Sequence, residues 1–315
     1  MEDRGWYLVM ALWGAAYGGV DVNRLARAVR AQSPDCAGAI VLIDRRRADI
    51  DPWVRQAPFP ADFARPECFG PGYVAKLAMF APEVAPPGTR CVYLDLDTLV
   101  LGDMGRLADC VDGPEAMLML PPASPLGFGA VRRWLFRRTG GRRMATGNSS
   151  VMAWHSDAAG NIAQHWRAIV ARGPTPAEAA CMGIDDVFIS WSAQMRLRGV
   201  PSALAVPFRR AFLSRAPGWL RKALRPWRRR RQAGLVAVTF NGANSKPATL
   251  ARLPEGAEVA DGRGRRARWC DSDMGQLRAA VLASWGAGSP DTARQPTVQP
   301  MVDAADSQPA SRPAR

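Results

Sequence analysis

The stretch RCVYLDLDTLVLGDM, residues 90–104, brings two carboxylates together at the end of an apolar strand. Residues 91–94 form a short, β-favouring run that is typical of a buried strand. Asp95 and Asp97 follow, and side chains two positions apart on a strand point the same way. Two adjacent like charges are unfavourable unless a cation lies between them. Since Mg²⁺ and Mn²⁺ prefer oxygen ligands and also bind phosphate, the pair predicts a metal bound with a phosphorylated ligand. The alternative is a pair of solvated turn residues.

The composition of the 315-residue chain is that of a globular protein, with 48% hydrophobic residues. Such a length fits one large domain or two small ones. The chain lacks any run of 18 consecutive apolar residues, and the apolar run 6–20 reads as a first strand and turn, not as a signal peptide. Six scattered cysteines without a C-x-x-C pair indicate free thiols in a reducing cytoplasm and disfavour a zinc site.

The net charge of +14 is concentrated in two segments. Residues 131–143 hold six arginines and no acid, and residues 209–231 hold nine arginines, Lys222 and no acid. The rest of the chain is therefore close to neutral. The second segment also contains Trp219, Leu220, Leu224 and Trp227. Cations mixed with tryptophan and leucine suit a segment that lies on an anionic bilayer surface. Nucleic acid fits the charge equally well, but no recognised nucleic-acid module is present.

Apolar patterning predicts an α/β fold, a mostly parallel sheet flanked by helices. Strands at 7–12 and 39–44 enclose a helical pattern with Asp21 as its N-cap, which is a β-α-β unit. Further strands are expected at 90–96, 116–120, 148–154 and 235–240, and helices at 73–80, 157–172 and 185–196. Residues 1–286 are expected to form one domain that contains the basic segment 209–231. The proline-rich stretch 287–315, which has no aromatic residue, is expected to be a disordered tail.

Six segments, in order, resemble the GT-A-fold (Rossmann-like) nucleotide-sugar glycosyltransferases of glycosyltransferase family 8, which includes glycogenin-like and bacterial galactosyltransferase-like enzymes. They are ALWGAAY (11–17), AKLAMF (75–80), YLDLDTLVLGDM (93–104), GNSSVMAW (147–154), GIDDVFIS (183–190) and VTFNGANSKP (238–247). The D-x-D segment is the most specific of the set. The resemblance covers about Tyr7 to Pro247 and implies a GT-A fold.

The first half of the resemblance implies residues for the nucleotide and the metal. The loop with Trp13 and Tyr17 would hold the base, with Tyr17 where an aromatic stacks on uracil. Lys76 matches a lysine that reaches the donor's phosphate or sugar and assists catalysis. Asp95 and Asp97 would bind Mn²⁺ or Mg²⁺.

The second half implies residues for the sugar and the diphosphate. The sugar pocket would be lined by Asn148, Ser149 and Ser150, where Ser150 replaces the usual glycine. Catalytic acids near the transferred sugar would be Asp185 and Asp186, where Asp186 replaces the usual glutamine. The last segment would contribute Gly242 and Lys246 to the diphosphate. The family's metal-binding histidine is replaced by Asn241 or Thr239, depending on the alignment, and Asn241 is the predicted third ligand because an amide oxygen can bind Mg²⁺ or Mn²⁺.

The expected function is a metal-dependent transfer of a sugar, from a UDP-sugar, to a glycan or lipid-linked acceptor, with retention of configuration. The expected place is the cytoplasm, with docking on the inner face of the membrane. Two alternatives remain open. LDLDTLV is also close to the motif of haloacid-dehalogenase-like phosphatases, although a β-α-β unit precedes it here. The basic segments alone would suit a non-catalytic module that binds membranes or RNA.

Overall fold

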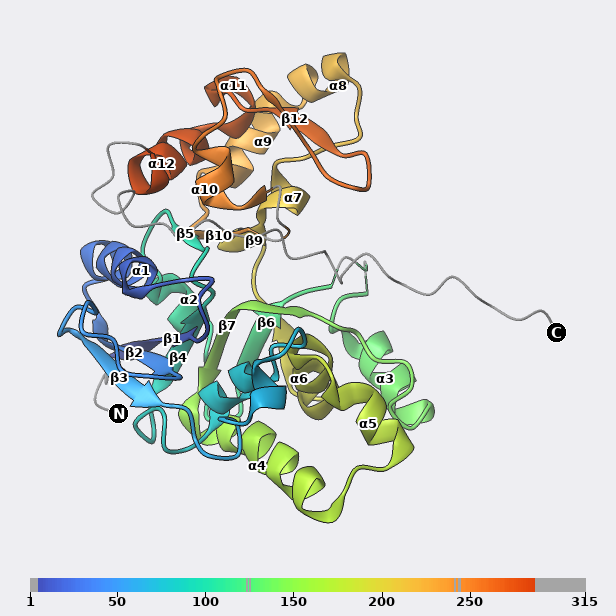
Figure 1. Cartoon of the computed structure of the whole chain (residues 1–315). Helices are drawn as coiled ribbons and strands as arrows, with labels where there is room; N and C mark the ends of the chain where they lie inside the picture. Colours follow the sequence, from blue (N-terminus) through green and yellow to red (C-terminus); the bar gives the residue numbers. More distant parts are fainter. Residues whose placement is uncertain (1–4, 123, 125, 241, 243–244, 287–315) are drawn as a thin grey trace.

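A seven-stranded sheet lies at the centre of the larger part of the molecule, in the order β3-β2-β1-β4-β7-β6-β8 (Figure 1). Neighbours run parallel from β3 to β4, β7 is antiparallel to both β4 and β6, and β8 is parallel to β6. The strands are β1 (Trp6–Leu12), β2 (Cys36–Ile43), β3 (Val54–Pro58), β4 (Arg90–Leu94), β6 (Met117–Leu120), β7 (Asn148–His155) and β8 (Leu197–Gly199). The predicted mostly parallel sheet is confirmed.

This computed structural model describes residues 5–122, 124, 126–240, 242 and 245–286, and for residues 158–161 the backbone only. The predicted tail, residues 287–315, lies outside the described residues. That residues 1–286 form one domain stays a prediction.

Helices cover both faces of the main sheet because its strands are apolar on both sides. Leu8 and Met10 of β1 pack with α1 (Gly19–Gln32) and α2 (Gly105–Ala108). Val9 and Ala11 point to the other face and pack with the second group of elements. This group comprises the 3₁₀ helix η2 (Val74–Phe80), α4 (Ser156–Arg172) and α6 (Asp185–Ala193). The remaining elements of this part are η1 (Pro66–Phe69), α3 (Ala130–Arg138) and α5 (Pro176–Met182).

Three local predictions need correction. Asp21 is not the N-cap of α1: Gly18 is, and the Asp21 carboxylate accepts the Gly18 N–H from the third helical position (2.9 Å). The helix predicted at 73–80 is a 3₁₀ helix, and it begins at Val74 because Tyr73 takes a left-handed conformation. The helix predicted to reach residue 196 ends at Ala193, because the next residues turn into β8.

A second part of the molecule is built on a three-stranded sheet of β5 (Leu99–Val100), β10 (Ala237–Thr239) and β9 (Ala205–Pro207). The strand predicted over 235–240 corresponds to β10, which is shorter than predicted and belongs to this second sheet. A separate core joins this sheet to the hairpin β11 (Glu258–Ala260) and β12 (Arg266–Arg268) and to α12 (Gln276–Trp285). The remaining helices of this part are α7 (Phe208–Ala211), α8 (Gly218–Ala223), α9 (Arg225–Gln232), α10 (Pro247–Leu250) and α11 (Asp271–Met274). Figure 1 shows the helices of this part above the small sheet, at the end of the molecule away from α4.

Candidate active site

Strand directions bring three separate segments to one edge of the main sheet. β1 and β4 are parallel, so the loops after both strands lie on the same side. β7 is antiparallel to β4, so its first residues lie beside the end of β4, where the Asp95 N–H donates to the Ser150 carbonyl (3.0 Å). The C-terminal ends of strands are where α/β sheets bind ligands. The D-x-D pair lies in this position.

A buried ammonium group is the centre of the site. Lys76 Nζ lies 3.0 Å from Asp95 Oδ1 and 3.2 Å from Asp185 Oδ2, and donates to Ser149 Oγ at 2.8 Å. The Ser149 hydroxyl in turn donates to Asp185 Oδ2 at 2.7 Å. Tyr93 completes the group, because its hydroxyl donates to Asp95 Oδ1 at 2.9 Å. Apart from Asp95, these side chains are buried, so the ion pairs are held in a region of low dielectric.

Charge balance within this group decides its protonation. Burial alone would lower the pKa of Lys76, but the negative charges of Asp95 and Asp185 hold that pKa well above its ordinary value. Burial would raise the pKa of Asp95, yet the Lys76 ammonium and its hydrogen-bond donors hold it below the usual range. Lys76 is therefore a permanent cation and Asp95 a permanent anion at neutral pH.

Asp186 is the unusual carboxyl of the site. It accepts the Ser149 N–H at 2.6 Å and an Asn148 amide N–H at 3.4 Å. Burial, with the neighbouring charge of Asp185, raises the pKa of Asp186 to about 7. A carboxyl with this pKa holds its proton for part of the time at neutral pH, so it can act as an acid or as a base.

Replacing Asp186 with asparagine should change the pH dependence of stability. Between pH 4 and 7 the folded protein keeps a proton on Asp186 that the unfolded chain has released, so the free energy of unfolding falls as pH rises. A pKa raised from 3.8 to about 7 corresponds to at most about 4 kcal/mol. Asp186→Asn should therefore be more stable than the wild type at pH 8 and lose this advantage by pH 4, as measured by urea unfolding. Asp35→Asn, at an exposed position, is the control and should show no such trend. A difference in the free energy of unfolding between Asp186→Asn and the wild type that is the same at all pH values would contradict the raised pKa of Asp186.

The second carboxylate has its own lysine. Asp97 forms an ion pair with Lys246, and Lys246 Nζ also donates to the Tyr17 hydroxyl at 3.2 Å. The Tyr17 hydroxyl lies 3.4 Å from Asp97 Oδ2. Burial raises the pKa of Asp97; the Lys246 ammonium counteracts this rise, while the charge of Asp95 adds to it. Tyr17 therefore lies against the D-x-D pair, with its ring under Lys246 (5.9 Å).

An aromatic group forms one border of the site. The ring of Trp13 lies 5.9 Å from Phe59, 6.1 Å from Phe69 and 6.2 Å from Tyr73. Tyr73 is the only non-glycine residue of the described chain with a positive φ, 53°, and it caps the 3₁₀ helix that carries Lys76. Gly72 sits so close to Gly183 that a Cβ atom there would lie 1.8 Å from the Gly183 carbonyl oxygen. This contact holds Tyr73 next to the start of α6. Strained backbone of this kind is concentrated at functional sites.

The left-handed conformation of Tyr73 predicts that a glycine variant is more stable than an alanine variant, which is the reverse of the order found in ordinary helical positions. Tyr73→Ala and Tyr73→Gly both remove the ring, but only glycine adopts the left-handed conformation without a steric penalty. The glycine variant should be more stable by about 1 kcal/mol, whereas alanine is the more stable residue in ordinary helical positions. Chemical denaturation of the two variants measures the difference directly. An alanine variant at least as stable as the glycine variant would show that the left-handed conformation is not kept.

The loop before Lys246 is held by an arginine from the basic segment. Gly242 has a φ of 82°, and a Cβ atom there would lie 1.6 Å from the Arg209 guanidinium. Arg209 Nε also donates to Ser245 Oγ at 3.2 Å. The positive φ favours glycine at 242, and Arg209 contacts the predicted diphosphate loop. Asn241, the predicted third metal ligand, lies outside the described residues and stays a prediction.

A divalent cation fits the oxygen donors of this site in part. Asp95 and Asp97 supply hard carboxylate oxygens, and the burial of Asp97 next to the charge of Asp95 favours further positive charge there. Two buried hydroxyls, of Thr98 and Thr239, have no hydrogen-bond partner within the described residues. Thr98 follows Asp97, and Thr239 ends β10, which pairs with β5 just beyond Thr98. No group of three or more His, Cys, Asp or Glu side chains suited to a metal occurs among the described residues. A bound cation would also compete with Lys246 for Asp97.

The predicted residues fall into two connected groups. One contains Lys76, Asp95 and Asp185 with the start of β7, and the other contains Asp97, Tyr17 and Lys246. Trp13 lies on the aromatic border. Tyr93 and Arg209 were not predicted. Tyr93 had a detectable signal, because it lies two residues before Asp95 and so shares its side of the strand, whereas nothing local in the sequence connects Arg209 to Gly242.

Comparisons with known proteins give structural matches only. No protein-family model and no curated protein matches the chain. The ligand-free structure of the bifunctional glycosyltransferase WbbM matches with a TM-score of 0.52 and 12% identity, over 91% of this chain and 50% of that chain. The galactosyltransferase LgtC, in complex with donor and acceptor sugar analogues, matches with a TM-score of 0.46 and 16% identity, over 76% and 88% of the two chains. Mouse xyloside xylosyltransferase 1 matches with a TM-score of 0.41 and 14% identity, over 76% and 98%.

The chain spans about half the length of WbbM, and at 12% identity the likeness is one of fold. It extends over 91% of this chain. The central mostly parallel sheet with helices on both faces agrees with this likeness. The chain therefore has the GT-A glycosyltransferase fold that its D-x-D segment and the five companion segments predicted.

Proposed function

We propose that this protein transfers a sugar from a nucleotide-sugar donor, a UDP-sugar in the first instance, to a glycan or lipid-linked acceptor. The observation that carries this proposal is the pairing of each D-x-D carboxylate with a lysine, Asp95 with Lys76 and Asp97 with Lys246. The glycosyltransferase fold supports the same function. Two cations beside two carboxylates form a site for a ligand whose negative charge increases during the reaction, such as a departing diphosphate.

The two lysines have different parts in this proposal. Lys246 is partly exposed, with 39% of its side chain accessible, so it can leave Asp97 and bind diphosphate oxygens. Lys76 is buried and held by three partners, so it positions Asp95 and Asp185 without moving. A charge that is already fixed, such as that of Lys76, acts without reorganisation, whereas Lys246 has to exchange Asp97 for the diphosphate.

A divalent cation, Mn²⁺ or Mg²⁺, would be held by Asp95 and Asp97, with water and diphosphate oxygens completing its shell. When bound, it would neutralise charge on the leaving diphosphate. Asn241 and Thr239 remain the candidates for a further protein ligand.

Asp185 and Asp186 would lie at the transferred sugar, next to Asn148, Ser149 and Ser150 at the start of β7. Asp185 is kept in place by Lys76 and Ser149, which suits a group that stabilises positive charge on the sugar ring. Asp186, with a pKa of about 7, suits proton transfer. Retention of configuration follows the family resemblance and is part of this proposal.

A screen of sugar nucleotides tests the function. The protein is incubated with each UDP-sugar and with other sugar nucleotides, with and without Mn²⁺, and the release of nucleoside diphosphate and the melting temperature are measured. We expect one donor to be hydrolysed slowly and to raise the melting temperature only with Mn²⁺. Release of inorganic phosphate from phosphomonoesters, without any effect of sugar nucleotides, would instead favour the haloacid-dehalogenase-like alternative.

A further inference from the structure

The basic segment forms a helical pair that packs little of its surface against the protein. Neither α8 nor α9 has a buried residue. Trp219 is 71% exposed, Trp227 60% and Leu224 43%. Exposed apolar side chains gathered on one short segment indicate a surface that contacts another molecule or a membrane. No helix within the described ranges has the length and apolar character to cross a bilayer.

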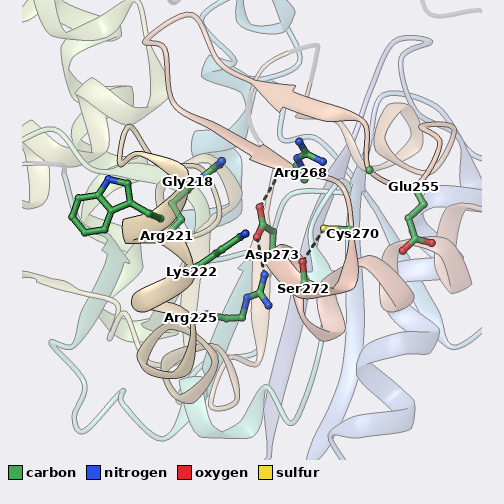
Figure 2. A pocket seen from close by; sticks show the side chains of 11 residues that line it. Gly218, Arg221, Lys222, Arg225, Glu255, Arg268, Cys270, Ser272 and Asp273 are labelled. Carbon is green, nitrogen blue, oxygen red and sulfur yellow. Dashed lines mark hydrogen bonds and ion pairs between the residues drawn. The ribbon is translucent and has the colours of Figure 1, made fainter.

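A cavity of about 740 Å³ lies between this helical pair and the β12–α11 region. Figure 2 shows Arg221, Lys222 and Arg225 on the helical side, facing Arg268 and Asp273 on the other. Trp219 also lines the cavity. An exposed tryptophan and a cationic cavity therefore adjoin each other on the same helix.

The two acidic residues that line the cavity lie next to basic residues, whereas two of its basic side chains have no partner. Asp273 lies 3.8 Å from Arg225 and accepts the Arg268 backbone N–H, and Glu255 lies 3.2 Å from Arg278. The side chains of Lys222 and Arg268, by contrast, have no hydrogen-bond or ion-pair partner within the described part of the chain. The buried Nε of Arg221 likewise lacks an acceptor among the described residues, although its Nη1 donates to the Arg266 carbonyl (2.9 Å). Among the described residues, Lys222 and Arg268 are thus the exposed cations that remain free to bind an anion in the cavity.

We propose that the α8–α9 pair docks on an anionic phospholipid surface and that a lipid phosphate enters the cavity between Lys222, Arg221 and Arg268. Trp219, Leu224 and Trp227 would insert at the level of the headgroups, where tryptophan is favoured. The exposed leucine distinguishes this partner from RNA, because an aliphatic side chain offers no surface on which a base can stack. This proposal is independent of the proposed transfer reaction, since α8, α9, β12 and α11, which supply residues that line the cavity, lie in the upper part of Figure 1, away from β4.

Flotation with vesicles tests the proposal. The full chain is mixed with vesicles of phosphatidylcholine, alone or with phosphatidylglycerol, at low and high salt. Wild-type protein should float only with the anionic vesicles, and part of the binding should survive high salt because apolar insertion is not screened. Trp219→Ala with Trp227→Ala should remove that salt-resistant part.

A pair of variants matched in charge separates a phosphate site from diffuse attraction. Lys222→Gln with Arg268→Gln changes the cavity, and Arg229→Gln with Arg230→Gln changes exposed cations outside it. Diffuse attraction contributes about fivefold in vesicle affinity per cation. If it acted alone, each double variant would bind the vesicles about 25-fold more weakly than the wild type. The cavity pair should lose at least about tenfold more than the control pair. All four positions are exposed, so the melting temperatures should stay unchanged.

Three results would overturn the proposal. The first is a wild-type protein that never floats with anionic vesicles at low salt. The second is an equal loss from the cavity pair and the control pair, which would reduce the surface to unspecific charge. The third is stronger binding to single-stranded RNA, or to inorganic phosphate alone, than to the vesicles.

Discussion

Replacing Lys76 with methionine is expected to destabilise the fold by about 3–5 kcal/mol and to abolish sugar transfer. The substitution removes the cation between Asp95 and Asp185 and leaves the two carboxylates without a counter-ion. Removing one member of a buried ion pair has a cost of that size. Urea unfolding measures the loss of stability, and release of nucleoside diphosphate measures the loss of activity.

Lys246→Met is the matched control for Lys76→Met. This lysine also pairs with one D-x-D carboxylate, but 39% of its side chain is exposed. Its removal leaves one buried carboxylate, that of Asp97, without its counter-ion, whereas Lys76→Met affects two. The loss of stability should therefore be smaller than for Lys76→Met, while diphosphate binding should weaken. The double variant Lys76→Met with Asp185→Asn should recover part of the stability, because one unpaired charge is then absent. A single Lys76→Met variant as stable as the wild type would show that the buried cluster is not formed.

Asp97→Asn is expected to remove Mn²⁺-dependent binding of a nucleoside diphosphate and to leave the fold intact. Asparagine has the same shape as aspartate, and burial already raises the pKa of Asp97, so a neutral side chain is tolerated there. A cation that loses one of two anionic ligands should bind at least about 100-fold more weakly, since loss of an outer partner alone has effects up to that size. Isothermal titration with UDP, with and without Mn²⁺, measures this change.

Asp109→Asn is the control for this prediction, because Asp109 is exposed and pairs only with Arg90 in the described hydrogen bonds and ion pairs. It should bind UDP and Mn²⁺ as the wild type does. An Asp97→Asn variant with unchanged affinity for both would show that the metal, if one is used, is held elsewhere. A fall in melting temperature of many degrees would show instead that the Asp97–Lys246 pair supports the fold.

Local sequence was sufficient for the site residues whose position depends on one strand or one turn. The i, i+2 spacing of Asp95 and Asp97 follows from strand geometry alone, and the same geometry places Tyr93 beside Asp95. The β-α-β unit at the start of the chain follows from its apolar periodicity, and it is observed as β1, α1 and β2. Element ends were less predictable: Tyr73 follows Gly72, which is packed against the distant Gly183, and α1 is capped by Gly18, which has no side chain.

Contacts across the chain decided how the site is connected. Lys76 and Ser149 are 73 residues apart, and Lys246 and Asp97 are 149 residues apart. The antiparallel direction of β7 and the pairing of β10 with β5 bring these residues together. Both are non-local strand pairings, which leave no periodic signal in any one segment. For the same reason the raised pKa of Asp186 was not predictable, since it results from burial and from the charge of Asp185.

The sequence by itself determined which residues can do chemistry: a carboxylate pair after an apolar strand, two lysines at set places in recognisable segments, and a basic stretch with tryptophans. These are properties of residue type and short spacing. Only the tertiary structure decided that Lys76 is buried between Asp95 and Asp185, that Lys246 remains accessible, and that the basic stretch lines a cavity. Burial and ion pairing depend on the three-dimensional neighbours of a side chain, and those neighbours are set by how the strands pair.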